Sequence, residues 1–493
     1  MRSDNSRDSF QALAGFSRVI EQQGRVQLDA DANERQAIQL HFLRTLAADL
    51  IGPHAGVGNA FEISADEGMR YNFMVGAGRY YVDGWPCENP QPASYRPGEG
   101  LHAQPWSGPK DQPDDGVNCI VYLEVWERHL AAVEHDYLLA RATPGTLREV
   151  ALGGPDTASR AQIVWQVGLL PISTAQYPPA TGLPEGKWDE LAVDLHRRQP
   201  IPVMRVKAAE RDDDDSDPCV VNVRSCYRGF ENQLYRVEIC RGGEAGTGDE
   251  NATFVFSRNN GSDVLPVEAI EGNKVRLAQG WRDALCAIKA GDHVEIAGPE
   301  TRLSAGPGQI LRVLGYDPDD LTLTLSDPPE QPAAQVSDGV TMRHWHHVER
   351  HPNTGAPAIA DDNALELTEG SWLTLEDGIS VLFGEPRTVI RGRRLPRHDE
   401  RYDNNLVEAA GDKIPASTDP AYYKSGDYWI FEARVELGDV VWPCQPDDPD
   451  EPAPQPPRGV ERHYAPLAAI TFDGNGKVTK TRDLRRTIKP VST

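Results

Sequence analysis

Apolar residues recur at helical spacing in one segment near the beginning of the chain. Within residues 31–50, apolar side chains follow one another every four residues, and two more lie beside them: Ile38, Phe42, Leu46 and Leu50, with Leu43 and Ala47. This spacing places them on one face of an α-helix. The helix is expected to end at Ile51-Gly52-Pro53, because glycine ends helices and proline cannot continue them.

The stretch that leads into this helix carries alternating acids. GRVQLDADANERQ, residues 24–36, places Asp29 and Asp31 two residues apart, which is how an EF-hand calcium loop begins. Such a loop needs Gly at its sixth position and Glu at its twelfth, where this chain has Glu34 and Leu40. A helix start needs a capping residue followed by an acid three positions later, and Asp31 with Glu34 meets that need. We therefore predict a helix N-terminus capped by Asp31 and no calcium site.

An extended arm with a turn at Gly24 precedes the helix. Arm and helix together, residues 1–55, are predicted to form a docking and oligomerisation element, because they stand apart from the pattern of the rest of the chain. We expect a contact between subunits there. The residues predicted for this interface are Arg25, Asp29, Asp31, Phe42 and Leu46.

From residue 61 onward the hydrophobic period changes to two. Segments rich in β-branched and aromatic residues are bounded by Gly, Pro, Asn and Asp, which is typical of short strands joined by turns. Examples are RYNFMVGAGRYYVDGWPCEN, NCIVYLEVWERHL, IVWQVGLLPI, NQLYRVEIC, ATFVFSRNN and GDYWIFEARV. GRYYVDGWPCEN is predicted to be a hairpin that turns at Asp83-Gly84. AIKAGDHVEIAGPE and GQILRVLGYDPDDLTLTLSDPP have the alternation of a small barrel inserted into a larger chain.

The expected fold is mainly β: a multi-domain β-sandwich and small-barrel architecture with one N-terminal α-helix. After the arm and helix of residues 1–55 we expect a first β domain (56–210), a second β region with the inserted barrel (211–350) and a C-terminal β region (351–493). Residues 443–457, PCQPDDPDEPAPQPP, are expected to form an exposed acidic loop.

Charge narrows the classes of partner. The 493 residues carry 75 acidic and 50 basic side chains, a formal net charge of −25. A surface this acidic repels nucleic-acid phosphates and anionic lipid, so we expect neither nucleic-acid binding nor membrane insertion. The first residues lack the apolar core of a signal peptide, and no run of roughly 18 apolar residues occurs. We expect a protein made in the cytoplasm without a signal peptide.

Motifs for catalysis are absent from the sequence. No P-loop, no nucleophile elbow and no HEXXH zinc motif occurs. We therefore predict no enzyme, no catalytic residue and no cofactor. The seven cysteines are scattered without the spacing of a zinc-binding pair. Buried reduced thiols are expected, with a disulfide between Cys219 and Cys226 as the alternative.

The densest cluster of potential metal ligands is HWHHVERH, at residues 344–351. On a strand, His344 and His346 would share one face, whereas His347 and His351 would share a face of a helix. A zinc site needs three or four ligands on a rigid frame, and no further ligand stands at a recognisable spacing. We predict an exposed polar strand beside a buried Trp345, with metal binding by these histidines as the alternative.

Several motifs distributed along the chain together resemble one bacterial family. They lie in order from about Phe16 to Asp483: FSRVIEQQGRVQLDADANE, GRYYVDGWPCEN, VYLEVWERHL, REVALGGPDTASRAQIVWQV, YRGFENQLYRVEI, ATFVFSRNNGS, GSWLTLEDGISVLF, SGDYWIFEAR and HYAPLAAI. The family is uncharacterised in function and is found with gene clusters for phage-tail-like contractile injection systems. The final TRDLRR also resembles a strand-ending motif of phage baseplate and fibre proteins. TMRHWHH departs from the family pattern, which favours Asp after the Trp, and no catalytic residue is carried over.

The resemblance implies a structural or adaptor component near the baseplate, spike or tail fibre of a contractile particle that is released or acts outside the cell. Parts of such particles are commonly trimers, so a homo-oligomer, with a trimer favoured, and other particle proteins are the expected partners. A second hypothesis is a carbohydrate- or receptor-binding module that uses Trp85 or Trp106. A third is a metal-dependent hydrolase or cargo effector that uses the histidines of residues 344–351.

Overall fold

The structure of the protein is a computed structural model. It describes residues 1–65, 70–95, 118–134, 147–152, 155–172, 202–209, 227, 229, 231–246, 248, 250–281, 287–303, 306–330, 339–350, 355–376, 378–384, 422–445 and 447–488. The fold is mainly β, as predicted, with several sheets, a small closed barrel and one long N-terminal helix, α1 (Asp29–Ile51). Within these residues, no helix is both long and apolar enough to cross a membrane.

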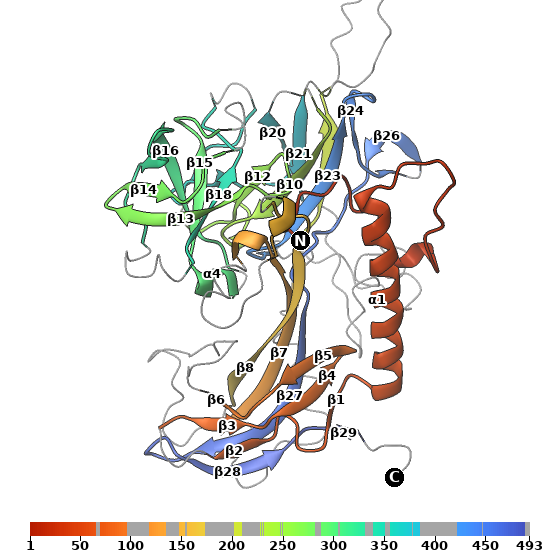
Figure 1. The fold of residues 1–493 in the computed structure, drawn as a ribbon, viewed down its shortest axis with the longest axis vertical. Helices are drawn as coiled ribbons and strands as arrows, with labels where there is room; N and C mark the ends of the chain where they lie inside the picture. Colours follow the sequence, from red (N-terminus) through yellow and green to blue (C-terminus); the bar gives the residue numbers. More distant parts are fainter. Residues whose placement is uncertain are drawn as a thin grey trace, which may run out of the picture.

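The lower part of the molecule in Figure 1 is built from three sheets around one apolar core. Their strand orders are β29-β1-β4-β5, β2-β3-β6 and β28-β27-β7-β8. The bounds are β1 (His54–Val57), β2 (Ile63–Ala65), β3 (Phe73–Val75), β4 (Gly78–Val82), β5 (Trp85–Asn89), β6 (Ala93–Ser94), β7 (Asn118–Leu130), β8 (Arg160–Ile172), β27 (Arg462–Phe472), β28 (Val478–Asp483) and β29 (Thr487–Ile488).

Three long strands connect this lower part with the upper part. β7 and β8 are antiparallel and pair over 13 residues each, and β27 pairs antiparallel with the other edge of β7. Figure 1 shows these strands running upward from the lower sheets. The sheets therefore combine strands from the beginning and the end of the chain, because β27 and β28 complete the core that β1–β8 begin.

The upper part contains a sandwich of two sheets. One sheet has the order β19-β12-β10-β23-β24 and the other the order β20-β21-β9. Both contribute to one core rich in aromatic rings, in which Phe383 lies 5.1 Å from Phe254 and 5.7 Å from Trp429 between ring centroids. The bounds are β9 (Met204–Ala208), β10 (Gln233–Ile239), β12 (Thr253–Ser257), β19 (Leu365–Glu366), β20 (Trp372–Glu376), β21 (Ile379–Phe383), β23 (Tyr428–Arg434) and β24 (Asp439–Val441).

The small barrel is closed in the order β13-β14-β17-β16-β15-β18. The two segments that predicted it supply β15, β16 and β17, so this prediction is confirmed. Alternate residues such as Val267, Val294 and Met342 fill its interior, and register shifts in β13 and β16 bend the sheet toward closure. The bounds are β13 (Val264–Glu271), β14 (Lys274–Leu277), β15 (His293–Ala297), β16 (Gln309–Asp317), β17 (Thr322–Leu325) and β18 (Thr341–Trp345).

Of two turn or loop segments predicted from the sequence, one is confirmed and the other is only partly correct. The hairpin at Asp83-Gly84 is confirmed, since both residues have positive φ, 47° and 82°, and they join β4 to β5. A Cβ on Gly84 would lie 2.1 Å from the carbonyl oxygen of Arg44, so glycine is what lets this turn contact α1. The expectation of an acidic loop at residues 443–457 was incomplete. This segment contains a two-stranded hairpin, β25 (Cys444–Gln445) with β26 (Asp448–Pro452). Strand β26 is exposed, as expected.

Candidate functional site

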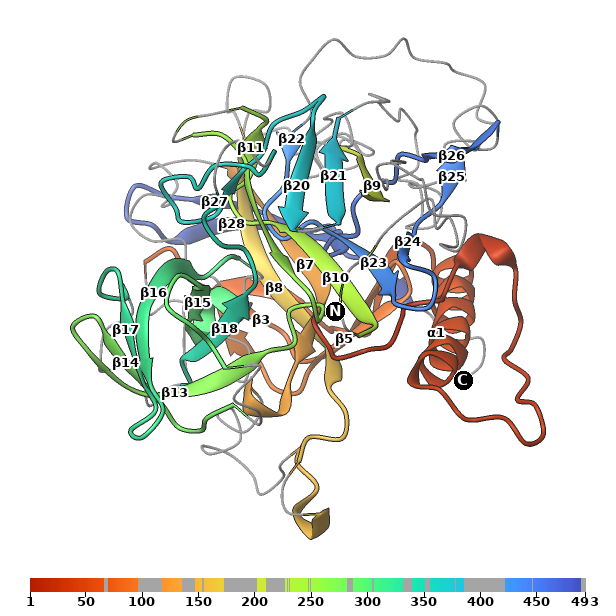
Figure 2. The same ribbon diagram turned by 90° about the horizontal axis from the view of Figure 1, so that it is seen from above.

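Helix α1 exposes most of its large apolar side chains. Its buried residues are Ala30 and Ile38, and Arg44 fixes the inner face by an ion pair with Glu127 at 3.0 Å and by stacking on Trp85. The opposite face carries exposed apolar side chains: Leu40, Phe42, Leu43, Leu46 and Leu50. Figure 2 shows α1 at the edge of the molecule, on the side away from the barrel. An amphipathic helix normally buries such a face, so this one lacks cover among the described residues.

The exposed face has the spacing of a coiled-coil seam. Six exposed residues, here called the outer seam, alternate at intervals of four and three: Ala32, Gln36, Gln39, Leu43, Leu46 and Leu50. This interval is that of the a and d positions of a heptad. The seam carries no charged side chain, so identical helices could pack along it without repulsion between like charges.

The acids at the start of α1 hold the N-terminal arm. The predicted cap at Asp31 was wrong: the N-cap residue is Leu28 and makes no side-chain capping bond. Asp29 accepts hydrogen bonds from Ser6 through the backbone N–H (2.8 Å) and the hydroxyl (2.6 Å). Asp31 pairs with Arg7 at 3.3 Å, because the arm folds back over the first turn and offers it donors and a cation.

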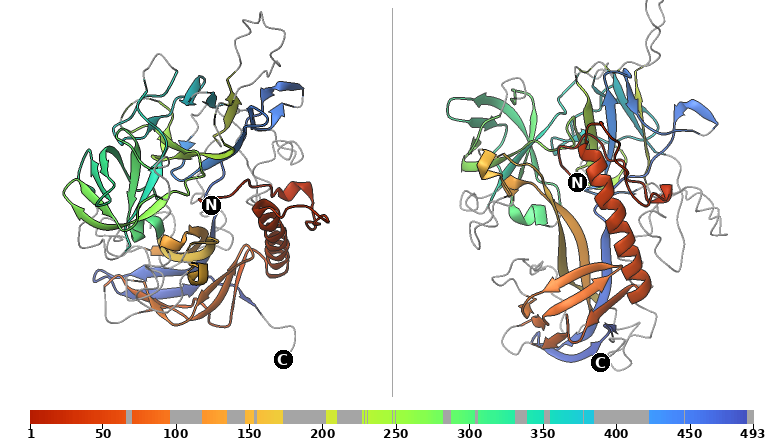
Figure 3. Two further views of the ribbon diagram at one scale, coloured as in Figure 1. Left: turned by 45° about the horizontal axis from the view of Figure 1, so that its top comes forward. Right: turned by 45° about the vertical axis from the view of Figure 1, so that its right-hand side comes forward.

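The five predicted interface residues therefore separate into two groups. Asp29 and Asp31 contact the arm of their own chain. Phe42 and Leu46 are exposed on the outer side of α1, and Arg25 is exposed in the arm. Figure 3 shows the arm looping out beside the top of the helix. The structure thus leaves Arg25, Phe42 and Leu46 accessible to another molecule.

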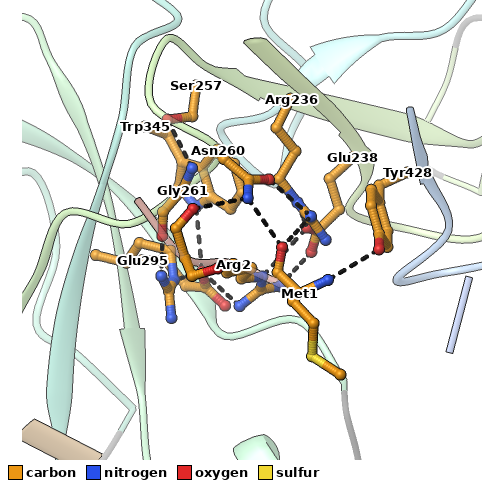
Figure 4. A network of polar contacts seen from close by, with 12 residues as sticks. Met1, Arg2, Arg236, Glu238, Ser257, Asn260, Gly261, Glu295, Trp345 and Tyr428 are labelled. Carbon is orange, nitrogen blue, oxygen red and sulfur yellow. Dashed lines mark hydrogen bonds and ion pairs between the residues drawn. The ribbon is translucent and has the colours of Figure 1, made fainter. Parts of the chain in front are cut away.

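The first residues of the arm enter the junction between barrel and sandwich (Figure 4). The Met1 amino group donates to the Tyr428 hydroxyl at 2.9 Å. The Met1 carbonyl accepts from Asn260 Nδ2 at 3.0 Å, and the same amide donates to the carbonyl of Ser3 at 2.9 Å. Asn260 has φ 56°, so a strained turn aims its amide at the arm.

A buried ionic cluster fixes the arm at this point. Glu238 on β10 binds both Arg2 of the arm and Arg236 of its own strand. Burial alone would raise the pKa of Glu238, but the two guanidinium groups outweigh it and lower the pKa to about 2. The guanidinium of Arg236 also stacks on the Tyr428 ring, 3.5 Å from its centroid.

The cluster continues into the barrel and the long strands. Glu295 on β15 lies 3.8 Å from Arg2 and 3.5 Å from Arg343 on β18. Arg343 in turn lies 3.6 Å from Glu134, which follows β7. Arm, sandwich, barrel and long sheet thus meet in one network. Sequence reasoning missed it, although the charged residues inside the apolar strand LYRVEI were a usable signal.

The histidine strand is buried, which corrects the prediction of an exposed polar strand. All five residues of β18 are buried, because β13 and β15 pair with its two edges. Trp345 is buried as predicted and donates to Glu295 at 3.1 Å. His344 lies on the same face of the strand as Met342, which faces the barrel interior.

His344 and His346 share a face, as predicted for a strand, and Asp263 joins them. One potential ligand atom from each of the three lies within 4.8 Å of the others. His347 is not part of this group. Its ring stacks on His293 with centroids 4.3 Å apart, and its Nε2 lies 2.9 Å from the carbonyl of Asn363. The fourth predicted candidate, His351, lies outside the described residues. Asp263 had no sequence signal, because only strand register brings it beside His344.

The predicted glycan tryptophans and the cysteines have clear positions where they are described. Trp85 is 6% exposed and covered by Arg44, so the hypothesis of an exposed sugar-binding Trp85 is wrong. Trp106 lies outside the described residues, as do Cys219 and Cys226. Cys87, Cys119 and Cys240 are buried free thiols and Cys444 is an exposed one. Burial raises the pKa of Cys119 to about 12, which leaves it unreactive at neutral pH.

Comparison with known proteins identifies one family. A family model described as a family of unknown function, DUF6519, matches residues 1–178 and 192–390. These ranges include the arm, α1 and the barrel. No curated protein and no solved structure matches the chain.

Proposed function

The chain belongs to the DUF6519 family of unknown function, and from this premise we propose that it is a structural component of a phage-tail-like contractile injection particle. In this proposal the chain works as a homo-oligomer, with a trimer favoured, near the baseplate, spike or tail fibre. The particle role rests on the motifs that resemble a family found with such gene clusters. The observation that carries the assembly role is the outer seam of α1.

The outer seam favours a second copy of the same chain as its partner. A seam with a and d spacing packs against other helices. The other described α-helix, α4 (Pro299–Leu303), is too short to cover it. Gln36 and Gln39 carry both donors and acceptors, so equivalent side chains around a symmetry axis can bond one another. Leu43, Leu46 and Leu50 would supply the apolar contact.

We expect Leu46→Glu to dissociate the oligomer. Burying one leucine side chain contributes about 1.5–3 kcal/mol, so a trimer loses roughly 5 kcal/mol or more when three are replaced by charges. The measurement is the molar mass across a dilution series by light scattering after size-exclusion chromatography. The matched control is Leu314→Glu on the barrel, because Leu314 is 53% exposed and Leu46 is 56% exposed.

Two outcomes separate the parts of the proposal. A wild-type chain that stays monomeric at high concentration contradicts assembly through α1. For the particle role, the sheath and tube proteins are isolated from the native host and probed for this chain. An oligomer that never accompanies sheath or tube contradicts the particle role and leaves self-association intact.

A further inference from the structure

One end of the barrel gathers side chains that suit a metal ion. Asp263 immediately precedes β13, His344 lies near the end of β18, and His346 directly follows that strand. We propose that Asp263, His344 and His346 bind a divalent transition-metal ion, with zinc as the ion whose preferred ligands they match. This site is independent of the proposed particle role.

The backbone holds the three ligands on a rigid frame. His344 N–H donates to the carbonyl of Asp263 at 3.0 Å, and His346 N–H donates to that of Phe256 at 2.9 Å. The potential ligand atoms lie within 4.8 Å of one another, whereas ligands around zinc at bond lengths of about 2.0–2.1 Å stand ~3.3 Å apart. Binding would therefore require the side chains to rotate and bring these atoms closer together by up to ~1.5 Å.

His344 shows the strongest sign of an unmet partner. Its side chain is 8% exposed, and its Nδ1 is buried without a hydrogen-bond partner among the described residues. A buried polar nitrogen without a partner is costly, and a metal ion would satisfy it. Its Nε2 lies 3.5 Å from the carboxylate of Asp292, which itself accepts from the backbone N–H of Lys289 at 2.8 Å. An acid behind a ligating histidine is the usual outer partner in metal sites.

The ligand set indicates which ions fit. Two imidazoles and one carboxylate suit zinc or ferrous iron and leave a coordination position for water. Arg258 is a cation beside His346. It forms a bidentate pair with Glu376, and the carboxylate offsets much of the repulsion between the guanidinium and an incoming metal ion. A bound ion would add a cross-link between the start of β13 and the end of β18, which already pair as neighbouring strands.

The test is zinc binding to the full chain, expressed without a histidine tag and first treated with a chelator. Calorimetric titration with Zn²⁺ is expected to give one ion per chain. Asp263→Asn and His346→Gln are each expected to weaken binding about tenfold or more. Co²⁺ is the second probe, because its visible absorption reports a low-coordinate nitrogen and oxygen site in the wild type and should be lost in both variants.

The control is His463→Gln, which removes a buried histidine paired with Asp83 at 3.0 Å in the lower part of the molecule. It is expected to affect stability and leave zinc affinity unchanged. Equal zinc affinity in the wild type and in Asp263→Asn overturns the proposal, and so does a wild type that binds no zinc at micromolar concentration. Since Asp263 is only half-buried at a strand start, its variant remains decisive even if His346→Gln does not fold.

Discussion

Glu238→Gln is expected to lower the free energy of unfolding by about 3–5 kcal/mol. Removing one partner of a buried ion pair leaves the other charge buried without compensation. Here the loss would leave both Arg2 and Arg236 without their carboxylate at the centre of the junction. The measurement is equilibrium unfolding in urea, followed by tryptophan fluorescence and far-UV circular dichroism.

The control for this variant is an exposed ion pair of the same chemistry. Glu268 pairs with Arg276 at 3.2 Å on the barrel surface, and both side chains are about half exposed. Glu268→Gln is expected to change stability by less than about 1 kcal/mol, since exposed pairs contribute little. Equal effects of the two substitutions would mean that the buried cluster does not stabilise the junction.

The same carboxylate makes stability depend on pH in the acid range. The pKa of Glu238 falls from 4.5 to about 2 on folding, so the unfolded chain binds its proton first as the pH drops. Its contribution is complete above pH 4.5 and is lost as the pH falls toward 2. The difference in unfolding free energy between wild type and Glu238→Gln should therefore shrink across this window, measured by urea unfolding at successive pH values. A constant difference from pH 7 to pH 3 contradicts the assignment.

Local patterns predicted the elements of this fold well. The period of two, the Asp83-Gly84 turn and the four-residue spacing in α1 are decided by neighbours along the chain, so they can be read from the sequence. The arrangement of the elements could not be predicted in this way. Nothing near β7 signals that its second neighbour is β27, more than three hundred residues later, because that pairing depends on the whole core.

The direction in which α1 faces was also beyond local reasoning. The apolar spacing of Phe42 and Leu46 predicts a buried face, but the body of the protein takes the side that carries Ile38 and Arg44. The same limit applies to the histidines. Periodicity placed His344 and His346 on one face, whereas the presence of Asp263 depends on which strand pairs with β18. Clusters formed by strand register are invisible to spacing rules.

Trp345→Ala is expected to lower the free energy of unfolding by about 3–5 kcal/mol and to separate the barrel from the sandwich. Trp345 is 1% exposed and packs between the two units with Cys240 and Val255 of the sandwich segment and Ile310 of the barrel. Its ring is the largest apolar contact at that junction, so its loss weakens the coupling as well as the stability. Barrel and sandwich should then unfold in separate steps.

The measurement is urea unfolding with chelator present, monitored both by circular dichroism and by limited proteolysis of the barrel. For Trp345→Ala the two probes should report transitions that do not coincide. Trp345→Phe keeps an aromatic ring but loses the bond to Glu295 and part of the buried packing of the indole, so about 1–3 kcal/mol and one transition are expected. The matched control is Trp281→Ala, which removes a half-buried ring in edge-to-face contact with Tyr316 at the barrel surface and should cost roughly 1 kcal/mol. Trp345→Ala could instead unfold in a single transition and lose no more free energy of unfolding than Trp281→Ala. In that case Trp345 does not couple the barrel to the sandwich, and the ionic cluster around Glu238 is the principal contact that does.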